Sequence, residues 1–302
     1  MGKRKGRRVN GILLLDKPLG MSSNAALQKV RYLFNAQKAG HTGSLDPLAT
    51  GVLPICFGEA SKVTSYLLDS DKRYLCTLQL GAVTSTGDKE GEILKERGIP
   101  AISSTQLETV LEQFRGDIEQ IPPMYSALKH NGQPLYKLAR KGIEVDRKVR
   151  KVRIYKLQVM DKTDTTITCD ISCSKGTYIR TLAQDIGEML GCGAHLSMLR
   201  RIEVSPFDCS QLYTIETIEN LMAENNEADS LLLPIDTALT HYPAITLSQE
   251  EAQRIQNGLK VKRAGIPQAN IIKLYLENGD FIGIGRDAGD NLLAPKRLMR
   301  TN

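Results

Sequence analysis

The chain has 302 residues and a formal net charge of +6; 41% of its residues are hydrophobic and 25% are charged. This length favours one large domain and one small one, because domains average about 100–200 residues. The apolar runs are far shorter than the roughly 20 residues that span a bilayer, and the basic N-terminus lacks the apolar core of a signal peptide. Membrane-spanning, collagen-like and largely disordered proteins are therefore excluded, and we expect a cytoplasmic protein.

The hydrophobic periodicity predicts alternating strands and helices over the first two thirds of the chain. In chain order they are a strand, a helix, a strand, a helix, two paired strands and a helix, at residues 11–16, 22–34, 73–80, 105–116, 151–160, 166–173 and 177–190. Residues 84–91 read as a polar turn. We expect Ser22 or Ser23 to cap the first helix, and Thr105 with Glu108 to form a capping box for the second, which Gly116 ends.

The last 60 residues read as a compact β-rich appendage. A mixed segment at 232–244 separates them from the rest. Ser248 with Glu251 caps a short helix, and Asn278–Gly279 between two apolar runs is a strong hairpin signal.

Positive charge is concentrated in two segments. Residues 1–8 carry five basic side chains and no acidic one, and residues 129–156 carry ten basic and two acidic side chains. These segments hold +5 and +8, so the remaining residues sum to −7. Tyr125 and Tyr136 lie in or beside the second segment, and basic residues mixed with aromatics suit looped or single-stranded nucleic acid. The plain alternative is a solvated tail and a solubilising loop.

The six cysteines and four histidines offer no metal site. No CxxC pair occurs and the histidines are far apart, so we expect reduced cysteines that serve as inert packing residues. The chain also lacks a GxxxxGK phosphate loop, an HExxH motif and a GxSxG motif. Chemistry driven by a bound nucleotide or metal is therefore not indicated.

Residues 40–53, GHTGSLDPLATGVL, hold a single carboxylate, Asp46, among small and turn-forming residues. Such a composition does not suit a helix or a strand, so the whole segment is predicted to be a shaped loop that fixes Asp46. The alternative is that Asp46 caps a helix whose first residue is Pro47.

Four sequence blocks give this loop a context. They are GILLLDKPLGMSS from Gly11, GHTGSLDPLATGVLPICFGEASK from Gly40, YLLDSDKRY from Tyr66 and CSKGTYIRTLAQDIG from Cys173. In this order and spacing they resemble the TruB family of tRNA pseudouridine synthases, which isomerise the T-loop uridine at tRNA position 55. The resemblance covers about residues 8–210. The C-terminal 60 residues resemble the small PUA-like RNA-binding domain of bacterial members.

The resemblance implies three catalytic residues. Asp46 would be the ionised carboxylate that attacks or stabilises the detaching nucleoside, and Arg180 would be its cationic partner. Tyr178 would lie beside the reacting nucleotide as a general base or hydrogen-bonding group. From the pattern alone, Tyr178 and Arg180 alternate at the start of a helix, and one of them could be plain surface. No cofactor and no metal are implied, because the reaction has no net redox change.

Further positions match residues that hold the flipped base. Tyr74 would stack on it, His41 would fill the space left by the extruded nucleotide, and Leu199 would give an apolar contact. Tyr178 belongs to this set as well. Taken without the resemblance, Tyr74 and Leu199 are equally compatible with the core, and His41 with a loop hydrogen bond. Lys17 and Pro18 are expected to support the Asp46 loop.

We therefore predict a mixed α/β (α+β) catalytic domain with a central mixed or antiparallel sheet over residues 1–240, with a thumb-like insertion at about 124–152, and a PUA-like domain over 241–302. The predicted partner is the T-arm of tRNA, bound by a monomer with no protein partner and no membrane. Two alternatives stay open: the catalytic subunit of an RNA-guided pseudouridine synthase, and a tRNA-folding protein.

Overall fold

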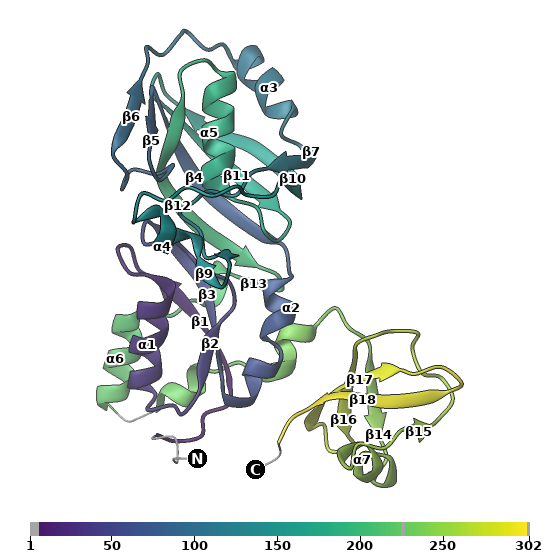
Figure 1. The fold of residues 1–302 in the computed structure, drawn as a ribbon. Helices are drawn as coiled ribbons and strands as arrows, with labels where there is room; N and C mark the ends of the chain where they lie inside the picture. Colours follow the sequence, from purple (N-terminus) through teal and green to yellow (C-terminus); the bar gives the residue numbers. More distant parts are fainter. Residues whose placement is uncertain (1–5, 225–226, 301–302) are drawn as a thin grey trace.

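The computed structural model describes residues 6–224 and 227–300. A nine-stranded sheet forms the centre of the large domain (Figure 1). Its main path is β1-β3-β12-β4-β11-β10-β7, with β2 added on β3 and β13 on β12. These strands are β1 Gly11–Lys17, β2 Ala39–His41, β3 Ala49–Phe57, β4 Lys72–Leu80, β7 Gly116–Gln120, β10 Arg150–Lys162, β11 Thr166–Cys173, β12 Ala194–Val204 and β13 Phe207–Asp208.

The sheet is mixed because β12 runs parallel to β3, whereas the other pairs in it are antiparallel. Gly51 permits this close pairing: its φ is +98°, and a Cβ there would lie 2.1 Å from the carbonyl oxygen of Arg201. β12 therefore joins the segment around Asp46 to the β4–β11 half of the sheet.

Helices cover the sheet at both ends (Figure 1). Helices α1 and α6 lie side by side near β1 and β3, and α5 packs on β12. The helices of the large domain are α1 Ser23–Leu33, α2 Thr64–Leu68, α3 Ser104–Glu112, α4 Leu135–Ala139, α5 Ile179–Met189 and α6 Ile215–Glu224. Among the described helices, none is both long and apolar enough to cross a bilayer.

Two short hairpins and four 3-10 turns complete this domain. The hairpins are β5 Ala82–Thr84 with β6 Ile93–Glu96, and β8 Lys129–His130 with β9 Gln133–Pro134. The 3-10 turns are η1 Gly58–Lys62, η2 Cys209–Gln211, η3 Glu227–Leu231 and η4 Ile235–Leu239.

The C-terminal residues form a separate five-stranded sheet in the order β14-β16-β17-β18-β15. Its elements are β14 Ala244–Leu247, α7 Gln249–Gln256, β15 Val261–Lys262, β16 Ile272–Leu276, β17 Phe281–Asp287 and β18 Leu292–Leu298. This sheet has its own apolar core and also contacts the large domain, where Ile284 packs with Phe207 and Leu239 and the Tyr275 hydroxyl donates to Asp236 at 2.7 Å.

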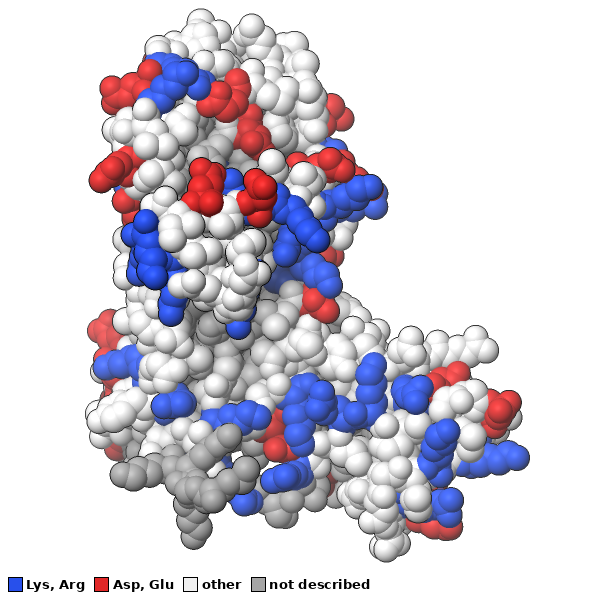
Figure 2. Space-filling model, in the orientation of Figure 1, with Lys and Arg blue, Asp and Glu red and all other residues white. Residues whose placement is uncertain are grey.

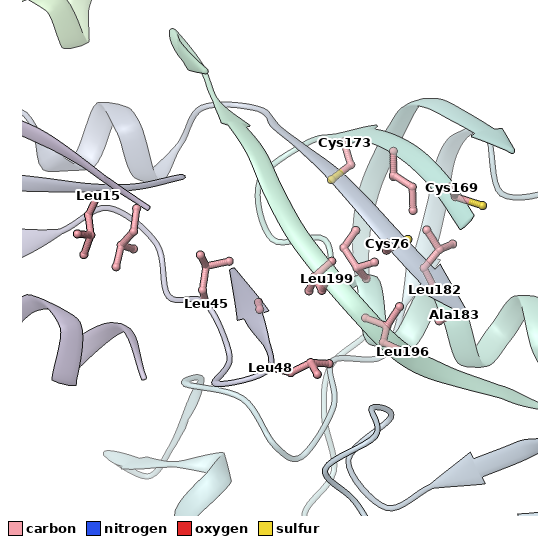
Figure 3. Close-up of a cluster of buried hydrophobic side chains, with 14 of the residues drawn as sticks. Leu15, Leu45, Leu48, Cys76, Cys169, Cys173, Leu182, Ala183, Leu196 and Leu199 are labelled. Atoms are coloured by element: carbon pink, nitrogen blue, oxygen red, sulfur yellow. The ribbon is translucent and has the colours of Figure 1, made fainter. Parts of the chain in front are cut away.

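The main core extends from α1 to α5 and includes the Asp46 loop (Figure 3). Leu45 and Leu48 flank Asp46 and are 6% and 3% exposed, in the same cluster as Leu196 and Leu199. Burying two leucines contributes roughly 3–6 kcal/mol, so packing fixes the loop on both sides of the carboxylate.

Most predicted elements agree with the structure. Ser22 caps α1 by accepting from Ala25 N, the strands at 151–160 and 166–173 pair as β10 and β11, and Ser248 caps α7 in a capping box with Glu251. The hairpin at Asn278–Gly279 joins β16 to β17.

Three predictions are wrong in detail. The capping box of α3 is made by Ser103 and Gln106, two residues earlier than predicted. The helix ends at Glu112, and Gly116 begins β7. Residues 40–53 are not one loop: only Thr42–Leu48 lie between β2 and β3, because the glycines permit strand pairing there. Five cysteines are buried as expected, but Cys209 is exposed.

Candidate active site

Asp46 lies in the Thr42–Leu48 loop, which neighbouring elements hold by its backbone. The Ser23 hydroxyl of α1 accepts from Leu45 N at 2.7 Å and donates to Leu45 O at 3.0 Å. The backbone N–H of Gly20 donates to Pro47 O at 2.9 Å. The segment after Asp46 is strand β3, so the alternative that Asp46 caps a helix is wrong.

Arg180, at the start of α5, forms an ion pair with Asp46. Arg180 Nε lies 2.9 Å from Asp46 Oδ2, while Nη1 donates to Thr86 O and Nη2 to Tyr125 O, both at 2.7 Å. The Arg180 side chain is only 5% exposed, whereas that of Asp46 is 40% exposed. Three donor positions are thus fixed, and within the described residues Asp46 Oδ1 has no hydrogen-bond or ion-pair partner.

The charge of Asp46 is set by opposing effects. Burial raises the pKa of its carboxyl group, and the nearby Asp88 raises it further, whereas Arg180 and Lys17 lower it. Asp88 is 3% exposed and lies 3.9 Å from Arg180 Nε, so it shares the guanidinium with Asp46. Arg180 therefore favours the ionised form of Asp46, whereas burial favours the neutral acid.

Lys17 lies close to the Asp46 loop, where its ammonium group is 3.5 Å from Pro47 O. It ends β1 with no exposed surface, and its ammonium group donates to the carbonyls of Pro18 at 2.8 Å and Met21 at 2.5 Å. Burial lowers the pKa of Lys17 to about 8, although the charge of Asp46 opposes this. A second cation thus contributes to the field at Asp46.

A cavity of about 310 Å³ opens beside Asp46. Among its lining residues, Tyr74, Tyr178 and Leu199 were predicted from the sequence to contact a base. Burial raises the pKa of both tyrosines, so their phenols are protonated at neutral pH. Leu199 is 7% exposed and belongs to the main core, as its alternative interpretation expected, and its contact with a base stays a prediction. Two rings and one carboxylate in such a space suit a single planar, polar ligand.

His41 is the one predicted site residue outside the lining of this cavity. It is in β2, which leads into the Asp46 loop, and burial lowers the pKa of its imidazole. Its Nδ1 is buried without a hydrogen-bond partner in the described chain. His41 thus lies at the end of the strand that leads into the Asp46 loop, and its Nδ1 is available for a hydrogen bond.

Sequence reasoning missed Gln120, which fixes the backbone of Tyr178. Gln120 is 2% exposed at the end of β7. Its side-chain oxygen accepts from Tyr178 N at 3.0 Å and its Nε2 donates to Tyr178 O at 3.3 Å. The Gln120 amide thus binds both peptide groups of Tyr178, the N-cap residue of α5, whose own side chain makes no capping hydrogen bond.

Sequence reasoning also missed Arg201 and Lys72, two buried cations that line the cavity. Arg201 Nε donates to Val52 O at 2.8 Å and its Nη2 donates to Gly43 O at 3.2 Å. Lys72 donates to carbonyls at the end of α2, and burial lowers its pKa to about 8. The signal available for Arg201 was the pair of arginines that follows Leu199. For Asp88 it was one of two acids in the polar turn at 84–91.

The thumb-like segment at 124–152 contains the β8–β9 hairpin and the short helix α4. Its basic residues are largely exposed; Arg140 lies over the ring of Tyr136 at 5.6 Å, and Arg147 pairs with Glu144 at 2.8 Å. Figure 2 shows Lys and Arg side chains on this part of the visible face. Within the described ranges, no cluster of three or more His, Cys, Asp or Glu residues could hold a metal ion.

Three family models match successive parts of the chain. Residues 31–179 match "TruB family pseudouridylate synthase (N terminal domain)", residues 180–240 "tRNA pseudouridylate synthase B C-terminal domain" and residues 243–299 "Pseudouridine synthase II TruB, C-terminal". The curated tRNA pseudouridine synthase B of Stutzerimonas stutzeri (strain A1501) is 54% identical over 99% of this chain and 98% of its own length. The chain belongs to the TruB family of pseudouridylate synthases.

Other relatives agree with this membership. The tRNA pseudouridine synthase B of Pseudomonas aeruginosa (strain UCBPP-PA14) is 52% identical over 99% of both chains. A chain in the crystal structure of a Cbf5-Nop10-Gar1 complex is 26% identical with a TM-score of 0.71, covering 91% of this chain and 78% of that one. The family expected from the four sequence blocks is thus confirmed, and so is its mixed α/β fold. This TruB family member is a pseudouridine synthase, an isomerase.

Proposed function

We propose that the chain converts one uridine in the T-loop of tRNA, at position 55, into pseudouridine. The observation that carries the proposal is the Asp46–Arg180 ion pair at 2.9 Å, beside a cavity lined by Tyr74 and Tyr178. The near full-length relatives named tRNA pseudouridine synthase B support tRNA as the substrate.

The reaction breaks the bond between ribose carbon 1′ and uracil N1 and forms a bond from carbon 1′ to uracil carbon 5. N1 gains a proton and carbon 5 loses one, so neither an oxidant nor a cofactor is required. Asp46 acts as the ionised carboxylate at the sugar or base while the uracil is detached and turned. Its partner Arg180 lowers the pKa of Asp46 and so favours the ionised form, against burial, which raises that pKa.

The tyrosines hold the extruded nucleoside. Tyr74 stacks on the base, which contributes roughly 1–3 kcal/mol toward the cost of flipping it out of the loop. Tyr178 is protonated at neutral pH because burial raises its pKa, so it acts first as a hydrogen-bond donor beside the base. Leu199 contributes apolar contact, and His41 enters the stack that the nucleotide leaves.

We further propose that residues 1–240 form the catalytic unit and 241–302 an RNA-binding unit. The exposed basic side chains of the thumb-like segment then contact phosphates of the T-arm, so affinity falls steeply with salt. The protein would act as a cytoplasmic monomer on bare tRNA. Turnover of an unmodified tRNA transcript without other proteins separates this function from that of an RNA-guided subunit.

The test is tritium release from tRNA labelled at carbon 5 of uridine. The Asp46→Asn variant is expected to lose at least about 1000-fold in rate, or about 4 kcal/mol in barrier, while still binding tRNA. Asp164→Asn, which changes an exposed aspartate in the same way, is the control and should react like the unmodified chain. Residual turnover of Asp46→Asn within tenfold of the unmodified chain would remove Asp46 from the reaction.

A further inference from the structure

A second concave site lies at the other end of β1. Its cavity, of about 370 Å³, is built from four segments that are far apart in the chain: Arg8–Asn10, Gln37–Lys38, Gly58–Lys62 and Arg300. The site therefore exists only when the large domain and the C-terminal tail are folded together. Figure 1 shows both described ends of the chain in this region.

The lining carries four cations and one carboxylate: Arg8, Lys38, Lys62, Arg300 and Glu59. Glu59 is already occupied, because it accepts from Lys62 Nζ at 2.5 Å and from Arg300 N at 2.7 Å. Within residues 6–224 and 227–300, the side chains of Arg8, Lys38 and Arg300 form no ion pair with a carboxylate. Three cations thus share one concavity with no protein anion left for them.

The backbone under these cations is fixed. Arg7, next to Arg8, forms a two-bond ion pair with Asp229 and donates from Nε to Phe34 O at 2.8 Å. The N–H of Glu59 donates to the Asn10 side chain at 2.9 Å, and Lys62 donates to Leu298 O at 2.6 Å. The cationic side chains therefore project from an ordered rim while they are themselves exposed.

We infer that this cavity, the Arg8–Lys38–Arg300 site, binds a backbone phosphate of the RNA substrate at a point remote from the reacting nucleotide. The inference rests on the proposed function. Unpaired lysine and arginine side chains around a concavity suit a phosphodiester, which displaces their counterions on binding. Figure 2 shows blue side chains running across the lower part of the visible face and onto the C-terminal sheet, with few red ones among them.

The position of the Arg8–Lys38–Arg300 site suits an RNA that is bound both there and at the catalytic cavity. Strand β1 runs from Gly11, next to the site, to Lys17, which donates to Pro47 O beside Asp46 at 3.5 Å. Seven residues at about 3.3 Å each place the two sites roughly 20 Å apart. An isolated T-arm stem-loop that fills the catalytic cavity need not reach so far, but a complete tRNA extends beyond this distance.

The experiment compares a full-length tRNA transcript with an isolated T-arm stem-loop. In the triple variant Arg8→Gln, Lys38→Gln, Arg300→Gln, we expect the Kd for full-length tRNA to rise at least tenfold at 0.1 M salt, with kcat unchanged. The slope of log K against log salt should become shallower by about 1, because one phosphate contact is lost. The Kd for the stem-loop should stay within twofold.

Lys95→Gln is the matched control, because Lys95 is an exposed lysine of β6, at the opposite end of the large domain. It should leave both dissociation constants unchanged, and thermal melting should show that all variants are folded. Equal losses on both RNAs, or a loss below twofold on full-length tRNA, would overturn the inference. The dissociation constants test the Arg8–Lys38–Arg300 site. Tritium release from the stem-loop by the unmodified chain tests the proposed function. The inference and the proposed function can therefore fail independently of each other.

Discussion

Gln120 offers the sharpest test of how the fold positions the reacting groups. Replacing it with glutamate keeps the size of the side chain and the oxygen that accepts from Tyr178 N. The change removes the Nε2 donor, which lies 3.3 Å from Tyr178 O, and puts a carboxylate oxygen against that carbonyl. The Tyr178 carbonyl keeps its bond from Leu182 N at 3.0 Å, so the cost comes from the lost Nε2 bond and from the buried carboxylate oxygen that faces this carbonyl, about 1–3 kcal/mol.

If this cost destabilises the active arrangement of Tyr178 and Arg180, kcat falls about 5- to 150-fold, since each 1.4 kcal/mol is a factor of ten. KM should change less than threefold, because the phosphate contacts are untouched. Protonation would restore a donor to the glutamic acid. The rate of Gln120→Glu relative to the unmodified chain should therefore rise as the pH falls from 8 to 6.

Single-turnover tritium release with saturating enzyme at both pH values measures this ratio. Gln113→Glu is the control: it makes the same chemical change at an exposed position of the helix α3 C-cap and should have no effect on rate. The reasoning is refuted if Gln120→Glu reacts within twofold of the unmodified chain at pH 8. It is refuted equally if a large loss does not change with pH, because the lost donor would then not be the cause.

Four more predictions follow from the same geometry. Arg180→Met should lower kcat at least 100-fold, because Asp46 loses the ion-pair partner that positions its carboxylate and favours its ionised form, and single-turnover rates check this. Because burial raises the pKa of Asp46 and the ionised form reacts, log kcat should fall with decreasing pH from a point above 3.8, the usual aspartate value, as a pH–rate profile would show. Tyr74→Phe should retain activity within about tenfold, whereas Tyr74→Ala should lose roughly 5- to 150-fold with the stacking energy, measured as kcat/KM. Gly51→Ala should lower the free energy of unfolding in urea by more than 2 kcal/mol, because a Cβ there meets the Arg201 carbonyl at 2.1 Å.

Much of the fold could be predicted because the local signals were strong. The buried face of α5, including Leu182 and Ile186, follows from helical spacing, and the β16–β17 hairpin follows from Asn278–Gly279. The capping box of α3 was misplaced because Ser103 with Gln106 competes with Thr105 and Glu108, and spacing alone does not choose between them. Strand β3 was not predicted at all, because threonine and glycine at 50–51 made its start resemble a loop.

The site was predictable only as a set of side chains. Four sequence blocks pointed to Asp46, Tyr74, Tyr178 and Arg180, and the structure brings these four to one cavity. The groups that hold them were not predictable, since they act through backbone atoms. Gln120 bonds the peptide groups of a residue 58 positions away, and the carbonyl of Tyr125 receives Arg180 whatever its own side chain is.

The strand order has a consequence for how the protein is made. β12 is inserted between β3 and β4, although the ribosome delivers it about 115 residues after β4 has left. Until Val204 has emerged, β3 and β4 have open edges facing each other, and unpaired edges promote mispairing and aggregation. The same late strand also brings Leu199 and Arg201 to the cavity. The sheet is therefore closed, and this wall of the pocket completed, at the same step of synthesis.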